Sequence, residues 1–155
     1  MFDFSKLKMR PRYPGGYKPA ATAAQIDELE KYCGHSLPEN YKRVLNDYNG
    51  SSPEAEYFDV INEDGVPGEY RLALFYYLDD NKNSRANIWW LIENYRHLMG
   101  QNALPFADDG LQQIYYLKWI DNIPQVWFLE YLDRDIAKTS CVKASFDELL
   151  ESLYE

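Results

Sequence analysis

Adjacent carboxylates, which could do chemistry, occur in this sequence at Glu63-Asp64, Asp79-Asp80 and Asp108-Asp109. Two carboxylates can act as acid and base when they face each other across a substrate at a fixed separation. Adjacent residues of an extended chain point to opposite faces, however, and those in loops usually face water. The stretch Phe106–Gly110, "FADDG", also lacks the alternating oxygen ligands of a calcium-binding loop. We therefore expect neither acid–base catalysis nor calcium binding from these pairs.

The other reactive residue types are isolated from one another. Neither histidine has a second His or Cys at metal-ligand spacing, and no serine lies in a G-x-S-x-G context. A glycine-rich phosphate loop is absent too. The tandem Trp89-Trp90 could stack on a nucleobase, but such sites need cationic surroundings, so we interpret Trp90 as widening an apolar helix face or as partly exposed. The sequence predicts no enzyme, no cofactor and no metal site, with an uncharacterised hydrolase as the alternative left open.

Charge and composition indicate a protein partner. The chain of 155 residues has a net charge of −9, and its first 20 residues carry five basic and one acidic side chain, which leaves −13 for the other 135 residues. Such a field repels nucleic acid and anionic membranes and favours encounter with a basic partner. Part of the aromatic content must lie in the core, but fourteen tyrosines also suit a recognition surface. An acidic protein kept soluble by its charge is the plainer interpretation.

Location can be argued from the cysteines and from hydropathy. Cys33 and Cys141 are isolated, and the N-terminal residues contain no apolar signal-peptide core. No run of about 18 apolar residues exists to span a membrane. We expect two reduced thiols in a cytoplasmic protein.

The helices and strands that must position these residues can be predicted from residues that typically begin or end a helix. Residues 1–20, rich in Pro and Gly, are expected to form a basic arm, and residues 21–155 a single domain. Thr22 and Gln25 fit a capping box that starts a helix over about residues 23–33. Pro38 starts a second helix, which Asn49-Gly50 ends. Further helices are predicted over 88–99, and from Ser145 on, where Ser-x-x-Glu forms another capping box.

Strands are predicted between these helices. The residues over 56–61 and 69–78 are largely apolar, and the second stretch is expected to be one central strand covered on both faces, with a turn over "EDGVPG" between them. Residues 112–120 and 125–132 are separated by a short polar linker that favours an antiparallel pair. A short strand is expected near 139–142. The fold class is α+β, a mostly antiparallel sheet with helices packed at both ends of the chain.

The stretch "IDELEKYCGHSLPENYKRVLNDYNG", Ile26–Gly50, resembles the N-terminal block of the SUKH superfamily, which takes in the fungal Smi/Knr cell-wall regulators and many bacterial immunity proteins. Later blocks follow the order of that family: Leu104–Gly110, Val126–Phe128 and Ser145–Leu150. The chain departs from the pattern at Ser51, where the family often has a second glycine, over residues 52–62, and in the arm before residue 20.

The resemblance implies a curved sheet with helices packed on it, no enzymatic activity, and an immunity protein that binds a cognate toxin, frequently a nuclease. A regulatory module that binds an endogenous cellular protein is the alternative. Under the first hypothesis we expect no direct contact with nucleic acid or membrane, and a toxin-binding surface formed by carboxylates at strand ends and tyrosines on the sheet: Asp79, Asp80, Asp108, Asp109, Tyr76 and Tyr115. The competing interpretation gives the tyrosines to the core and the aspartates to ordinary turns.

Overall fold

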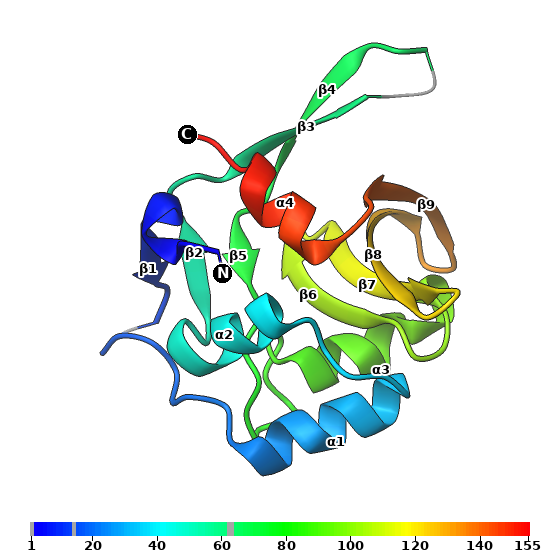
Figure 1. The fold of residues 1–155 in the computed structure, drawn as a ribbon. Coiled ribbons are helices and arrows are strands. Elements are labelled where there is room, and N and C mark those ends of the chain that lie inside the picture. Colours follow the sequence, from blue (N-terminus) through cyan, green and yellow to red (C-terminus); the bar gives the residue numbers. More distant parts are fainter. Residues whose placement is uncertain (1, 14, 62–63) are drawn as a thin grey trace.

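The structure is a computed structural model that describes residues 2–13, 15–61 and 64–155, so Glu63 of the first acidic pair lies outside the described residues. The fold is α+β, as expected (Figure 1). Its helices are α1 (Ala23–Cys33), α2 (Glu39–Asp47), α3 (Ile88–Met99) and α4 (Phe146–Ser152), with a short 3₁₀ helix over Phe4–Leu7. Its strands are β1 (Met9–Pro11), β2 (Ser51–Pro53), β3 (Tyr57–Ile61), β4 (Pro67–Arg71), β5 (Leu74–Phe75), β6 (Leu104–Asp108), β7 (Ile114–Ile120), β8 (Ile123–Asp133) and β9 (Ile136–Lys143).

Seven of the strands form one antiparallel sheet in the order β1-β2-β5-β6-β7-β8-β9, which does not close into a barrel. The predicted antiparallel pair is confirmed as β7 and β8, with Tyr116 opposite Trp127. Asp121 and Asn122 join them with positive φ angles of 51° and 65°. Positive φ at both central residues is the two-residue hairpin turn whose twist matches the strands.

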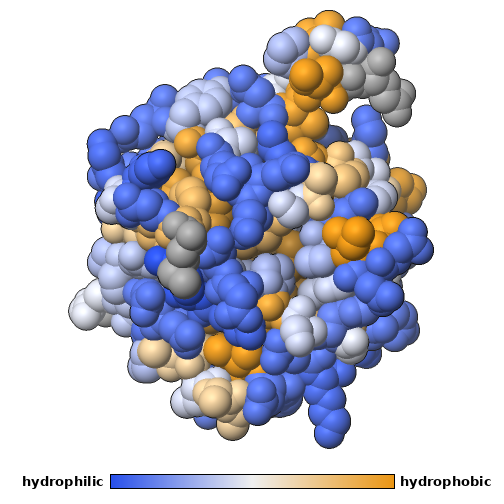
Figure 2. All heavy atoms as spheres, viewed as in Figure 1, coloured by the Kyte–Doolittle hydropathy of each residue, from blue (hydrophilic) through white to orange (hydrophobic). Residues whose placement is uncertain are grey.

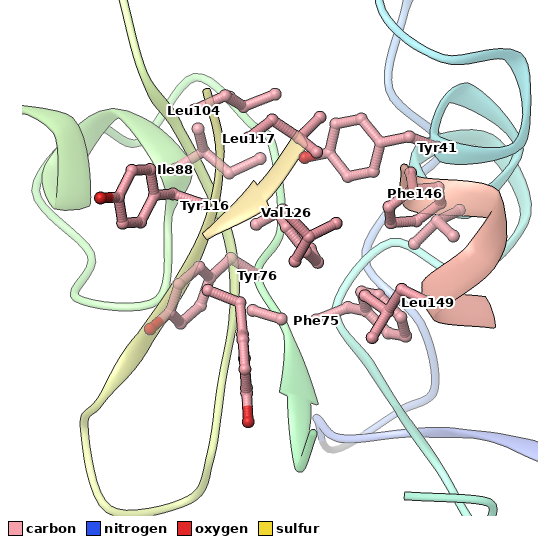
Figure 3. Packing of buried hydrophobic residues seen from close by; sticks show 14 of the residues in the cluster. Tyr41, Phe75, Tyr76, Ile88, Leu104, Tyr116, Leu117, Val126, Phe146 and Leu149 are labelled. Atoms are coloured by element: carbon pink, nitrogen blue, oxygen red, sulfur yellow. The ribbon is translucent and has the colours of Figure 1, made fainter. Parts of the chain in front are cut away.

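Helices cover the two faces of this sheet. Tyr41 of α2, Phe106 of β6 and Phe146 of α4 make mutual edge-on ring contacts at centroid distances of 5.4–6.0 Å. Figure 3 shows Tyr76 and Tyr116 on the opposite side, towards Ile88 of α3. The alternation of side chains along a strand explains the division, because neighbouring residues such as Phe75 and Tyr76 point to opposite faces. The sheet is therefore buried on both faces at its centre.

The expected helix pair is present, although α2 ends at Asp47, before the predicted Asn49-Gly50 signal. Thr22 and Gln25 form both bonds of the capping box, and Gly34 follows α1 in the left-handed conformation. In α2, Pro38 occupies the N-cap, one position before the predicted one. Ser145 caps α4 by accepting a hydrogen bond from the backbone N–H of Glu148.

The predicted single strand over residues 69–78 is wrong. Its first part belongs to β4, which pairs with β3 in a separate two-stranded sheet, and its later part is β5, which pairs with β2 and β6. β4 also takes in Pro67 and Gly68 of the predicted turn. The chain leaves one sheet and joins another at Leu72 and Ala73, so the predicted strand is divided between two different sheets.

The hairpin of β3 and β4 projects from the body, and α4 and the C-terminal end lie at its base (Figure 1). Tyr154 and Tyr57 exchange backbone hydrogen bonds of 2.8 and 3.0 Å, and the Tyr154 hydroxyl donates to Asp59 over 2.7 Å. Towards the tip, Ile61 and Val66 are 71% and 55% exposed. Figure 2 shows hydrophobic residues gathered on this hairpin, above a face that is mostly hydrophilic.

Residues of the expected N-terminal arm also contact the domain. Phe4 and Leu7 of the 3₁₀ helix are buried in the core, and β1 pairs with β2, with Arg10 opposite Ser52. Tyr13 lies so close to Gly50 that a Cβ at this glycine would come within 2.7 Å of its ring. The basic segment therefore extends the main sheet by its edge strand.

Candidate functional site

The turn between β6 and β7, residues 108–113, is held in shape by its two aspartates. The carboxylate of Asp108 accepts a hydrogen bond of 2.9 Å from the backbone N–H of Gly110. That of Asp109 accepts from the N–H groups of Leu111 and Gln113 over 2.8 and 3.1 Å. Leu111, at the tip, is 77% exposed. This turn divides two hollows, one on each face of the sheet.

The first hollow, which we call the α3 pocket, has a volume of about 240 Å³. Its floor is apolar and deeply buried, and its rim includes exposed polar side chains. It is lined by Tyr76, Arg85, Ala86, Trp90, Leu91, Tyr95, Asp108, Gln112 and Ile114.

The structure brings two of the predicted site residues together in this pocket. The hydroxyl of Tyr76 lies beside the carboxylate of Asp108 and interacts with it, because β5 and β6 are neighbours and Leu74 lies opposite Asp108 in the sheet. Burial raises the pKa of Asp108 above its ordinary value, against the hydrogen bonds from Gly110 and Tyr76, which lower it. The pocket therefore holds a partly desolvated carboxylate beside a buried tyrosine.

The second hollow, which we call the hairpin groove, lies on the other face and has a volume of about 360 Å³. It is lined by Glu69, Tyr70, Arg71, Asp109, Leu111, Tyr115 and Phe128. Tyr115 is fully buried, and its hydroxyl donates to the carbonyl of Arg71 over 2.7 Å. Burial raises the pKa of Tyr115 well above its ordinary value. This side chain thus forms the floor of the groove.

Asp79 and Asp80 belong to another segment, the loop over residues 79–87 that leads into α3. The carboxylate of Asp79 accepts hydrogen bonds from the Asn87 amide over 2.8 Å and from the Asn81 N–H over 2.9 Å. Asn87 is fully buried and caps α3 through the Trp89 N–H. Asp80 is exposed and accepts from the side chain of Gln25 over 3.0 Å. Asp79 thus shapes the loop, whereas Asp80 faces solvent beside α1.

Most residues of the α3 pocket were not anticipated as site residues, and Arg85, Trp90 and Tyr95 are among them. Trp90 is half-buried, with its ring centroid 6.3 Å from that of Tyr95. The sequence carried a signal for Trp90, because it lies one position off the apolar stripe of its helix. Tyr95 lines the pocket because of the way in which α3 packs against the sheet, and the residue pattern does not predict that packing.

Among the residues that the structure describes, no group of three or more His, Cys, Asp or Glu side chains is placed to hold a metal ion. None of the helices in residues 2–13, 15–61 and 64–155 has the length and apolar character needed to cross a membrane.

This fold defines the class of the protein as an α+β domain with one large antiparallel sheet that helices cover on both faces. Its two cysteines are free and form no disulfide. A family model described as SMI1-KNR4 cell-wall, SUKH_6, matches residues 23–150. The chain therefore belongs to the SUKH family. Comparisons with curated proteins and with solved structures gave no match.

Proposed function

We propose that this chain is an immunity protein, which binds a cognate toxin domain one to one and blocks it. The observation that carries the proposal is the SUKH family match over residues 23–150. Bacterial members of this family neutralise toxins by binding, and such an inhibitor needs no catalytic group of its own. We place the protein in the bacterial cytoplasm, where Cys33 and Cys141 would remain reduced.

The charge of the chain supports a basic toxin, and a nuclease in particular. The 135 residues after the basic N-terminal segment carry a net −13. A nuclease domain must attract a polyanion, so its active-site face is positively charged and complementary to this field. Complementary charge accelerates association and suppresses wrong partners. The same field disfavours direct binding of nucleic acid to the immunity protein itself.

The binding surface that we propose is centred on the turn over residues 108–113. This turn offers the exposed side chain of Leu111 between the α3 pocket and the hairpin groove. Asp108 and Asp109 face the two hollows, and Tyr76 and Tyr115 support them from the sheet. Asp80 adds exposed negative charge near α1, whereas Asp79 keeps its loop in place.

The test is co-expression with the toxin domain encoded beside this gene, scored by growth and then by co-purification. We expect rescue of growth and a 1:1 complex that survives size-exclusion chromatography. Continued killing, or no toxin gene in the neighbourhood, would contradict the proposal. Recovery of a housekeeping protein in its place would favour the alternative of a regulatory module.

A further inference from the structure

The α3 pocket combines aromatic surfaces with a single carboxylate. Tyr76, Leu91 and Ile114 form its floor and are only 3%, 4% and 1% exposed. The rings of Trp90 and Tyr95 are half-buried and stand at 63° to each other. Aromatic faces of this kind attract cations through the ring quadrupole, most strongly at Trp.

Asp108 supplies a charge that no salt bridge of the described residues neutralises, although Arg12 lies near enough to lower the pKa of its carboxyl. Its carboxylate accepts a hydrogen bond from Gly110 and lies beside the hydroxyl of Tyr76. An ionised carboxylate has about four acceptor positions, so it can take further donors. Within the part of the chain that the structure describes, no basic group lies within ion-pair distance of Asp108. A partly buried carboxylate without a salt bridge costs stability, and sites that serve binding commonly carry such a cost.

Arg85 shows which cation the ring face accepts. Its guanidinium lies 5.9 Å from the centroid of the Trp90 ring. The side chain is exposed, and among the described residues no carboxylate forms an ion pair with it. By contrast Lys82 of the same loop, which lies over Trp89, is paired with Glu28 over 2.9 Å. Arg85 can therefore move into solvent without breaking a salt bridge.

We propose that the α3 pocket receives one arginine side chain of the toxin, with its guanidinium stacked on Trp90 and paired with Asp108 in place of Arg85. A planar guanidinium suits both contacts, since it stacks on aromatic rings and binds a carboxylate through two parallel N–H groups. The acidic field of the chain brings a basic partner to this face. The identity of the partner rests on the proposed function, whereas the chemistry of the pocket does not.

The test measures the affinity for the toxin domain of one variant that should weaken binding and one that should tighten it. Asp108→Asn keeps an oxygen acceptor for Gly110 and Tyr76 but removes the charge. We expect at least about a tenfold loss of affinity, the lower end for a close interfacial charge pair. Asp27→Asn on α1 makes the same charge change at an exposed position and should alter affinity by less than about twofold. Arg85→Gln should tighten binding by more than Lys82→Gln, which removes an equal charge from the same loop.

A small-molecule probe separates this inference from the proposed function. Argininamide is titrated into the whole chain while the indole N–H of Trp90 is followed by NMR, and Trp90→Leu assigns the signal. A saturable shift that disappears in Asp108→Asn supports the pocket, even if no toxin binds. A toxin complex that Asp108→Asn leaves unchanged overturns the inference and leaves the immunity role intact. No saturable shift together with no toxin complex overturns both.

Discussion

Asn49 ties three parts of the chain together from a buried position, and its replacement provides a strong test of the fold. It is 1% exposed. Its amide donates to the carbonyls of Pro19 and Leu78 over 2.8 and 2.9 Å, and its side-chain oxygen accepts from the Leu78 N–H over 2.9 Å. The segment before α1, the end of α2 and the chain after β5 thus meet at one side chain.

Asn49→Ala leaves one N–H and two carbonyl groups without this partner. A buried polar group without a partner costs about 1–3 kcal/mol. The N–H and the carbonyl of Leu78 make buried hydrogen bonds with Asn49, whereas the hydrogen bond to the Pro19 carbonyl is only partly buried. We therefore expect a loss of about 2–4 kcal/mol in the free energy of unfolding. For a domain of about this size, stability totals about 5–15 kcal/mol, so the loss is large.

The assay is urea unfolding followed by far-UV circular dichroism. The matched control is Asn94→Ala, which removes a single exposed hydrogen bond to the Trp90 carbonyl and should change stability by less than about 0.5 kcal/mol. Asn49→Asp should also destabilise at neutral pH, because a carboxylate would replace the amide donor in front of two carbonyls. A loss below about 1 kcal/mol for Asn49→Ala would refute the reasoning.

Three further predictions concern the aspartates and the cysteines. Burial raises the pKa of Asp108, so the folded chain binds this proton more tightly, and the contribution of Asp108 to stability falls as the pH rises from about 4 through its raised folded-state pKa. The melting temperature of Asp108→Asn minus that of the wild type should therefore be larger at pH 7 than at pH 4; an equal difference would contradict the assignment. Asp79→Ala removes two hydrogen bonds from the loop before α3 and should lower stability by about 1–2 kcal/mol in urea unfolding, whereas Asp80→Ala should be near neutral. Cys141 is exposed and should react with a thiol reagent in the native state, while Cys33 is buried, with its pKa raised to about 12, and should react only on unfolding; mass spectrometry of the labelled chain decides this.

The helices could be predicted because their signals are local. The capping box of Thr22 and Gln25, the proline before α2 and the cap at Ser145 each act within a few residues of the helix they start. The β7–β8 hairpin was accessible for the same reason, since a two-residue turn joins its strands.

The strands that the sequence did not reveal depend on distant partners. β5 has only two residues and exists because β2 and β6 flank it, and β4 is separated from it by pairing with β3. β6 was not counted as a strand, although Leu104–Asp108 stood out by its resemblance to the family. Likewise the docking of the N-terminal segment requires the surface of β2, which is formed from residues about 40 positions later.

The sequence predicted which residues could form the candidate site, but the pairing of the strands determines which of them lie together. Asp108 and Tyr76 lie about 30 positions apart and meet because β5 and β6 are neighbours. Ile114 and Tyr115 line different hollows because successive side chains of β7 alternate between the two faces of the sheet. That these residues contact a toxin is still a prediction.

The central claim is that this chain inhibits a toxin by occupying it. The most direct measurement is a titration of the purified chain into a fixed concentration of the neighbouring toxin domain, with nuclease or other toxin activity as the readout. We predict that activity falls linearly and vanishes at one equivalent, and that Asp108→Asn requires an excess while Asp27→Asn does not. Full toxin activity in a severalfold excess of the folded chain would contradict the account.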